Sequence, residues 1–269
     1  MTEISGRAAV VTGGGSGIGM GIAKELAKQG ASVAVADIIL DNAKKVADEI
    51  KAAGGKAVAV HCDVCERESI RKMKADANAA LGPIKLVFAN AGATNFEKLI
   101  EIKDNDADWI IQVNLMGVMN TTRAFLPDMI AAKEGHIMAT ASMAGLLPGW
   151  IPVHVVYSAA KMGIIGMMMN LALETKEHDV YTTLYCPGGV STGMGANNAR
   201  YRPARFGGPG NAEVHVPEAS FKNNRPFIFD HPEQRRYFRK TYSDIVEACY
   251  DDCEDYEREV GRPPVVRRR

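Results

Sequence analysis

Strand-like and helix-like patterns alternate along most of the chain, and this alternation constrains the fold more than any other feature. Seven apolar runs are typical of strands: Arg7–Thr12, Ser32–Asp37, Lys56–Val64, Lys85–Ala91, Gly135–Ser142, Val180–Cys186 and Arg225–Asp230. Stretches with helical periodicity lie at 18–29, 41–53, 67–80, 106–131, 155–176 and 232–259. Repeated units of this kind predict an α/β fold, a doubly wound parallel sheet with helices on both faces.

The length and composition fit one domain. A chain of 269 residues with 46% hydrophobic residues is long enough for one α/β domain with a large core. We therefore expect a single domain over residues 1–269, with a flexible tail at 262–269 (RPPVVRRR).

Several polar and glycine-containing segments follow directly after predicted strands. Right-handed crossovers place all of these segments at one edge of a parallel sheet, where open sheets bind their ligands. They are the turn at 12–19, Asp37, Asp63, the turn Asn90–Gly92, Ser142 and the pair Pro187 and Gly188.

The first of these segments is a glycine-rich turn, Thr12–Gly19 (TGGGSGIG), between a strand and a helix. A helix N-terminus offers free N–H groups and the positive end of the helix dipole to a pyrophosphate. Side chains at Gly13, Gly17 or Gly19 would obstruct that approach or require positive φ. The spacing differs from G-x-G-x-x-G, and a purely structural turn is the alternative.

Asp37 ends the second strand, about twenty residues after the glycines. An acid at that position accepts hydrogen bonds from both ribose hydroxyls of NAD. It would repel a 2′-phosphate, and no Lys or Arg lies at 14–16 to offset its charge. We therefore expect NAD rather than NADP.

Tyr157 and Lys161 lie four residues apart in YSAAK, fifteen residues after Ser142. On a helix these two side chains share a face, so the ammonium group would favour the phenolate and lower the tyrosine pKa toward working pH. That would make Tyr157 a general acid or base. Taken alone, the spacing is more typical of a solvated surface pair, and the neighbouring motifs are what favour the catalytic interpretation.

Together these motifs resemble the compact, single-domain short-chain dehydrogenase/reductase family, which has a Rossmann-like fold. The resemblance covers most of residues 5–230, with its motifs in the family's order. The resemblance implies that Tyr157 exchanges a proton with the substrate oxygen, that Ser142 polarises this oxygen, and that Asn114 holds a water in a proton path. Lys161 would lower the tyrosine pKa and bind the nicotinamide ribose.

The resemblance also implies a full set of cofactor contacts. Asp63 and Val64 would contact adenine, the turn Asn90–Gly92 the central part of the cofactor, and Thr192 its carboxamide end. The implied cofactor-binding residues are Gly13, Ser16, Gly17, Ile18, Gly19, Asp37, Asp63, Val64, Asn90, Ala91, Gly92, Tyr157, Lys161, Pro187, Gly188, Val190 and Thr192.

Two features bear on the substrate. The spacing from Ser142 to Tyr157 is two residues longer than is most common in the family, which should reshape the loop that faces substrate. Trp150 and His154 either line the pocket, or Trp150 packs against the lid and His154 is exposed. The Gly- and Pro-containing segment 189–224 breaks the strand–helix alternation and is a candidate lid. Its residues Arg200, Arg202 and Arg205 bind a substrate carboxylate or are solvated.

Within the family, three stretches are similar to Cα-dehydrogenases that oxidise benzylic alcohols of lignin-type aryl ethers: 108–118, 199–207 and about 226–246. The expected reaction is the NAD-dependent interconversion of a secondary alcohol and a ketone, the alcohol being bulky or aromatic. The alternatives are a ketoreductase of hydroxyacyl or lipid-type substrates, and a non-catalytic NAD-binding regulator.

Charge and cysteine content bear on partners and location. Lys plus Arg and Asp plus Glu number 32 each, so we expect no nucleic-acid or membrane partner. The start of the chain does not resemble a signal peptide, and we expect no apolar segment of 18 residues and a cytoplasmic location. Five cysteines without regular spacing suggest reduced thiols, and Cys62 and Cys65 alone do not predict a metal site.

The family resemblance implies a homodimer or homotetramer. The methionines of 162–169 form a subunit contact, belong to the core, or provide an adaptable substrate surface.

Overall fold

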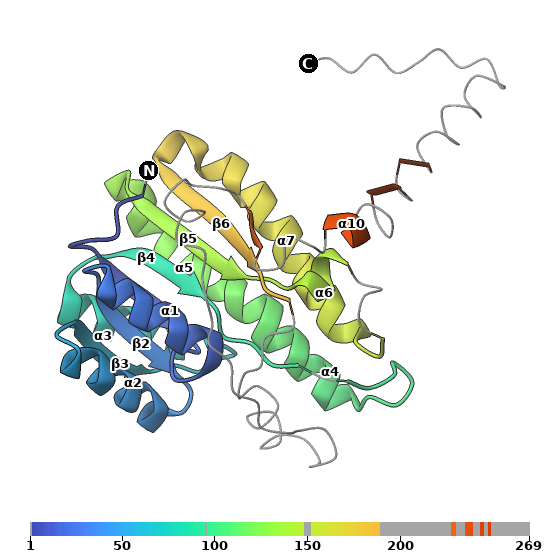
Figure 1. Cartoon of the computed structure of the whole chain (residues 1–269), viewed down its shortest axis with the longest axis horizontal. Coiled ribbons are helices and arrows are strands. Elements are labelled where there is room, and N and C mark those ends of the chain that lie inside the picture. Colours follow the sequence, from blue (N-terminus) through green and yellow to red (C-terminus); the bar gives the residue numbers. More distant parts are fainter. Residues whose placement is uncertain are drawn as a thin grey trace. The chain divides into compact units, whose positions relative to one another are not determined.

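Seven parallel strands form the centre of the protein in the computed structural model (Figure 1). The structure describes residues 2–94, 96–147, 152–188, 227–229, 235–238, 243–244 and 247–248. By its contacts the chain divides into two units, Met1–Asp230 and His231–Arg269, which are described separately. The expectation of one domain over the whole chain stays a prediction.

The strand order in the first unit is β3-β2-β1-β4-β5-β6-β7, and every neighbouring pair is parallel. The strands are β1 Ala8–Thr12, β2 Ser32–Asp37, β3 Lys56–His61, β4 Ile84–Ala89, β5 Gly135–Thr140, β6 Val180–Cys186 and β7 Phe227–Phe229. This confirms the predicted α/β fold with a doubly wound parallel sheet.

Helices follow most strands, as the periodicity predicts. They are α1 Gly17–Lys28, α2 Leu40–Ala52, α3 Arg67–Leu81, α4 Asp104–Ile111, α5 Gly117–Ala132, α6 Met143–Leu146 and α7 Val155–Thr175. A π-helical segment, η1 Gln112–Met116, joins α4 to α5, and a 3-10 turn, η2 Lys176–His178, follows α7. In the second unit the structure describes α10, Arg235–Phe238.

Helices cover both faces of the sheet. Alternate residues of the strands, such as Val11 of β1 and Val33 and Val35 of β2, form one core cluster with apolar residues of α1 and α2. On the opposite face α3, α5 and α7 pack in a row against the strands, and Figure 1 shows α1 and α5 on different sides of the sheet. All five residues of β1 are buried, which explains its uninterrupted apolar sequence.

The winding of the chain reverses at β1. Val11 of β1 is in register with Val35 of β2 on one side and with Phe88 of β4 on the other. The connections after β1 and after β3 therefore leave in opposite directions along the sheet. Such a switch point leaves a crevice at the carboxyl ends of the central strands.

Two predicted boundaries differ from the structure for local reasons. The stretch 106–131 is not one regular helix, because η1 interrupts it where the Asn114 side chain donates to the Ile110 carbonyl at 2.9 Å. Strand β3 ends at His61 instead of Val64, since Asp63 turns the chain by accepting from the Cys65 N–H at 2.9 Å. The predicted lid at 189–224 and tail at 262–269 lie outside the described residues, as does most of the predicted helix 232–259.

One helical stretch corrects the expectation that no 18-residue apolar segment is present. Residues Val155–His178 are long and apolar enough to cross a membrane by length and composition, with a mean hydropathy of 1.3 over 18 residues. The core helix of a soluble protein passes the same test, and α7 packs against α4, α5, α6 and β6. The cytoplasmic location stays a prediction.

Candidate active site

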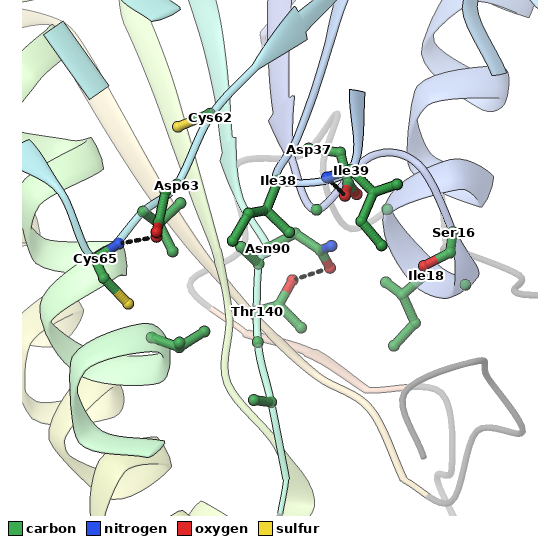
Figure 2. A pocket seen from close by; sticks show the side chains of 18 of the residues that line it. Ser16, Ile18, Asp37, Ile38, Ile39, Cys62, Asp63, Cys65, Asn90 and Thr140 are labelled. Atoms are coloured by element: carbon green, nitrogen blue, oxygen red, sulfur yellow. Dashed lines mark hydrogen bonds between the residues drawn. The ribbon is translucent and has the colours of Figure 1, made fainter. Parts of the chain in front are cut away.

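A cavity of about 400 Å³ lies at the carboxyl edge of the sheet (Figure 2). The β1–α1 turn, the ends of β2, β3 and β4, and helices α4 and α7 contribute to its wall. The lining residues are Gly13, Ser16, Gly17, Ile18, Gly19, Asp37, Ile38, Ile39, Cys62, Asp63, Val64, Cys65, Asn90, Ala91, Gly92, Ala93, Trp109, Val113, Thr140, Tyr157 and Lys161.

The glycines of the β1–α1 turn allow close packing of backbone on backbone. Gly13 has φ +63°, and a Cβ there would lie 2.9 Å from the Ala91 Cα. A Cβ on Gly19 would overlap the Gly13 carbonyl and lie 2.7 Å from Nδ2 of Asn90. The turn is therefore pressed against β4 and against the first turn of α1, whose leading N–H groups have no partner within the helix.

Asp37 at the end of β2 holds a fixed position beside this turn. Its two carboxylate oxygens accept from the Gly15 N–H and the Ile39 N–H, each at 2.9 Å, and its residue is 8% exposed. Each oxygen can accept more than one hydrogen bond, so these contacts leave acceptor capacity on the cavity side. Ile38 next to it is 44% exposed and also lines the cavity.

The end of β3 forms another part of the wall. Asp63 caps the following turn through Cys65, as Figure 2 shows, and its own N–H donates to the Ser69 hydroxyl at 2.9 Å. Cys62 and Cys65 are free thiols, and burial raises the pKa of each to about 12. Neither is therefore a ready thiolate at neutral pH. No group of three metal-binding side chains occurs in the part of the chain that the structure describes.

Asn90 ties the ends of three central strands together. Its Nδ2 donates to the Thr12 carbonyl of β1 at 3.1 Å, and its Oδ1 accepts from the Thr140 hydroxyl of β5 at 3.0 Å (Figure 2). The Thr12 hydroxyl in turn accepts from the N–H groups of Asn90 and Ala91. These bonds fix the floor of the cavity.

The Ser142 side chain, which follows β5, lies within hydrogen-bonding reach of the phenol of Tyr157 in the first turn of α7. Tyr157 is 8% exposed, and burial raises the pKa of its phenol to about 12, although the bond from Ser142 acts in the lowering direction. Ser142 is itself held in place, because its hydroxyl accepts from the Ala144 N–H at 3.1 Å.

Lys161 lies one helical turn beyond Tyr157, with Nζ 5.5 Å from the centre of the phenol ring. It is 2% exposed and donates to the Thr140 carbonyl at 2.8 Å. Burial lowers the pKa of this amine to about 7 and so disfavours its charged form. The expected lowering of the Tyr157 pKa by Lys161 is therefore corrected: burial is the larger effect, and Ser142 is the group that lowers this pKa.

Asn114 lies in η1 and is fully buried. Its Nδ2 donates to the Ala93 carbonyl at 2.8 Å as well as to Ile110, and its Oδ1 accepts from the Ala93 N–H at 3.3 Å. Both amide hydrogens are thus used within the protein. The observed contacts make Asn114 a clamp that holds the segment after β4, and its expected role in a proton path stays a prediction.

Thirteen of the predicted cofactor-binding residues line the cavity: Gly13, Ser16, Gly17, Ile18, Gly19, Asp37, Asp63, Val64, Asn90, Ala91, Gly92, Tyr157 and Lys161. Asn114, Ser142, Pro187 and Gly188 are not part of its lining. The Pro187 carbonyl accepts from the Met143 N–H at 2.9 Å and so joins the ends of β5 and β6. Val190, Thr192, Trp150 and the arginines of 189–224 lie outside the described residues.

Other lining residues were not predicted. Ile38, Ile39 and Ala93 follow strands directly, so the rule that picked Asp37 also points to them. Thr140 ends β5 and offers the same signal. Trp109 and Val113 come from α4 and η1, and no local pattern marks them, because their position depends on how these helices cross the sheet edge.

His154 was expected either to line the pocket or to be exposed. In the structure it is 4% exposed and stacks on Tyr157, with ring centres 4.4 Å apart and planes inclined by 12°. Its Nε2 hydrogen-bonds the Thr94 hydroxyl at 2.7 Å. The side chain is therefore not exposed, and it is not among the residues that line the cavity either. Burial lowers its pKa to about 4.

The sequence of this chain is similar to those of known oxidoreductases. Residues 7–202 match the short chain dehydrogenase family. Oxidoreductase UcpA of Salmonella typhimurium is 34% identical over 200 residues, which cover 74% of this chain and 75% of UcpA.

Three solved structures show the same architecture. A short chain dehydrogenase/reductase from Burkholderia phymatum, in complex with NAD, is 28% identical with a TM-score of 0.81 over 92% of this chain and 97% of that one. The apo form of LigD from Sphingobium sp. strain SYK-6 is 26% identical with a TM-score of 0.79 over 91% and 97%. A metagenomic short-chain oxidoreductase in complex with NADP is 36% identical with a TM-score of 0.65 over 70% and 85%.

Both nicotinamide cofactors thus occur among the solved relatives. Because the family match spans most of the strands and helices that build the cavity, the chain belongs to the short chain dehydrogenase family of oxidoreductases.

Proposed function

We propose that the protein is an NAD-dependent oxidoreductase that interconverts a secondary alcohol and a ketone. The observation that carries this proposal is that Tyr157 and Lys161 line the same cavity as Asp37, with the Ser142 side chain beside the phenol and the Lys161 amine 5.5 Å from its ring centre. A nucleotide-binding protein without catalysis has no need for a buried phenol and a buried amine at this place.

The residues of the cavity fit a dinucleotide. The β1–α1 turn leaves backbone N–H groups at the start of α1 for a pyrophosphate, and Asn90, Ala91 and Gly92 would lie along the central part. The Asp37 carboxylate, held by Gly15 and Ile39, would accept the ribose hydroxyls and repel a 2′-phosphate. This supports NAD over NADP.

Tyr157 would act as the acid and base of the reaction. Bound NAD supplies the hydride acceptor for alcohol oxidation. In oxidation the Tyr157 phenolate would take the hydroxyl proton of the alcohol, and Ser142 would donate a hydrogen bond to the substrate oxygen. In ketone reduction the neutral phenol returns this proton.

Lys161 would support this transfer from behind the phenol ring. Its hydrogen bond to the Thr140 carbonyl fixes the amine near both Tyr157 and Gly92, where a Cβ would lie 3.6 Å from Nζ. The ribose next to the nicotinamide would meet the amine at this place.

We further propose a bulky or aromatic secondary alcohol as the substrate. Three exposed apolar side chains lie next to His154, which stacks on Tyr157: its chain neighbours Val153 and Val155, and Phe96, whose ring stacks on the imidazole. A benzylic alcohol of the aryl-ether type is one member of this class. The proposed direction in the cell is oxidation, because cellular NAD pools are kept oxidised.

A homodimer or homotetramer is proposed from the family resemblance. On α7, Leu173 is 74% exposed and Met169 is 53% exposed, whereas Met168 is buried. The outward apolar side chains support a subunit contact along this helix.

Tyr157→Phe tests the function. The variant keeps the ring and loses the hydroxyl, so turnover should fall by about a thousandfold or more, while NAD affinity, measured by calorimetry, should stay within a few-fold. Activity is measured as NAD reduction with benzylic, alicyclic, steroidal and hydroxyacyl alcohols. Activity of the variant close to that of the wild type would refute the role of Tyr157, and preference for hydroxyacyl substrates would favour a ketoreductase.

A further inference from the structure

His154 lies in a stack of three rings. Its imidazole is parallel to Tyr157 at 4.4 Å and to Phe96 at 4.6 Å, with interplanar angles of 12° and 15°. Because no stacking contact joins Phe96 to Tyr157 directly, the imidazole lies between the other two rings. Phe96 is 41% exposed, so the stack runs from the surface to the buried phenol.

The backbone before His154 is strained. Val153 has φ +56°, a left-handed conformation that a β-branched residue adopts only at an energetic cost of about 1–3 kcal/mol. His154 is the residue that precedes α7, and Tyr157 follows three positions later in its first turn. The strained residue therefore sets the direction in which the His154 ring enters the stack.

Stability alone does not explain an imidazole at this position. Its Nδ1 is buried and has no hydrogen-bond partner among the residues that the structure describes. A buried polar atom without a partner costs roughly 1–3 kcal/mol. Burial also keeps the ring neutral, so His154 does not act as a cation on Tyr157.

The anchor of the ring lies on another segment. The Thr94 hydroxyl, 2.7 Å from Nε2, belongs to the segment after β4, which Asn114 clamps through Ala93. The imidazole thus has a fixed rotation in its own plane as well as a fixed tilt. Because the imidazole can neither rotate nor tilt, it limits the tilt of the phenol ring that stacks on it.

We propose that His154 is a positioning residue for Tyr157: by stacking flat on the phenol, it keeps the Tyr157 hydroxyl at the Ser142 hydroxyl and at the place of the reacting oxygen. This inference rests on the proposed function and adds to it a residue that acts through Tyr157 without touching substrate. If the phenol tilts, the bond from Ser142 weakens, and the pKa of Tyr157 rises further.

A matched pair of variants separates stacking from the loss of polar atoms. His154→Leu and His154→Phe both remove the ring nitrogens and the bond to Thr94, but only Phe keeps a planar ring. We expect His154→Leu to lower kcat for alcohol oxidation by about ten- to a hundredfold with KM for NAD unchanged, and His154→Phe to stay within about threefold of the wild type. His178→Leu, at a histidine in η2 remote from the site, is the control.

The pH dependence of alcohol oxidation separates positioning of Tyr157 from a purely structural role, because loss of stability alone would not shift this dependence. With Lys161 as the ionisable side chain beside the phenol ring, loss of the Ser142 bond should shift the profile of His154→Leu to higher pH, and His154→Phe should keep the wild-type profile. Equal activity of His154→Leu and wild type, or equal impairment of the Leu and Phe variants, would overturn the proposal.

Crystal structures of the two variants test the position without turnover. The distance from the Tyr157 hydroxyl to the Ser142 hydroxyl should lengthen with Leu and stay unchanged with Phe. If the wild type oxidises no alcohol, the proposed function fails, and these distances still decide whether His154 positions Tyr157. An unchanged distance in His154→Leu would refute the positioning role.

Discussion

At the scale of single residues, burial governs the acid–base chemistry of this site more than neighbouring charges do. The pKa of Tyr157 is raised to about 12, and those of Lys161 and His154 are lowered to about 7 and about 4. Each shift favours the neutral form, as expected for groups removed from water. The base form of Tyr157 is therefore scarce at neutral pH.

This shift fixes the sign of the pH dependence. Alcohol oxidation requires the phenolate, so kcat/KM for oxidation should rise by up to about tenfold per pH unit below the apparent pKa. Ketone reduction requires the neutral phenol and should fall as pH rises through the same pKa. Initial rates of oxidation from pH 6 to 10 check the rise, and a profile of oxidation that falls with rising pH over this range would exclude Tyr157 as the base.

Asp37→Ala tests the choice of cofactor. Removal of the carboxylate removes the repulsion of a 2′-phosphate and the acceptors for the ribose hydroxyls, so the ratio of kcat/KM for NAD over NADP should fall by about ten- to a hundredfold. Asp41→Ala, at an exposed carboxylate in the first turn of α2, is the control. An unchanged ratio in Asp37→Ala would show that Asp37 does not contact the ribose.

At the scale of elements, the β1–α1 turn depends on close backbone contact. In Gly19→Ala the new methyl group would overlap the Gly13 carbonyl and push the turn away from α1. NAD affinity should fall by at least about tenfold, as measured by calorimetry, because the phosphate-binding N–H groups move with the turn. Wild-type affinity in Gly19→Ala would contradict the described packing.

The sequence predicted a helix, strand or turn well where its conformation depends only on its own residues. The apolar run of β1, the periodicity of α2 and the glycines of the first turn all act locally, and each was found close to its true bounds. The π-helical segment at Asn114 was not predicted, because it depends on hydrogen bonds to Ile110 and to Ala93 of a separate segment.

The same distinction holds for the site. Residues after strand ends, such as Asp37 and Asp63, were predicted from their position in the chain alone. The stack of Phe96, His154 and Tyr157 was not predicted. Phe96 and Tyr157 are 61 positions apart along the chain, and the stack also depends on the left-handed backbone at Val153. The direction of the pKa shift of Tyr157 was also predicted wrongly. The burial of this side chain depends on tertiary packing, which the spacing of the motif does not reveal.

At the scale of the whole molecule, the proposed assembly depends on the outer side of α7. Leu173→Lys places a charge where the structure leaves an apolar side chain 74% exposed. If α7 forms the subunit contact, this charge should shift the protein from dimer or tetramer toward monomer at micromolar concentration, as measured by light scattering after gel filtration. Leu99→Lys, 60% exposed on another segment, should leave the mass unchanged. A wild type that is monomeric would refute the assembly itself.

The reversal of chain winding at β1 has a consequence for how such a protein diversifies. Under the proposed function, recognition of the adenosine half would fall to the strands on one side of that reversal, and binding of the alcohol would fall to those on the other. Because different side chains would carry the two tasks, a substitution near the end of β2 would alter the preferred coenzyme and leave Tyr157 and Lys161 in place.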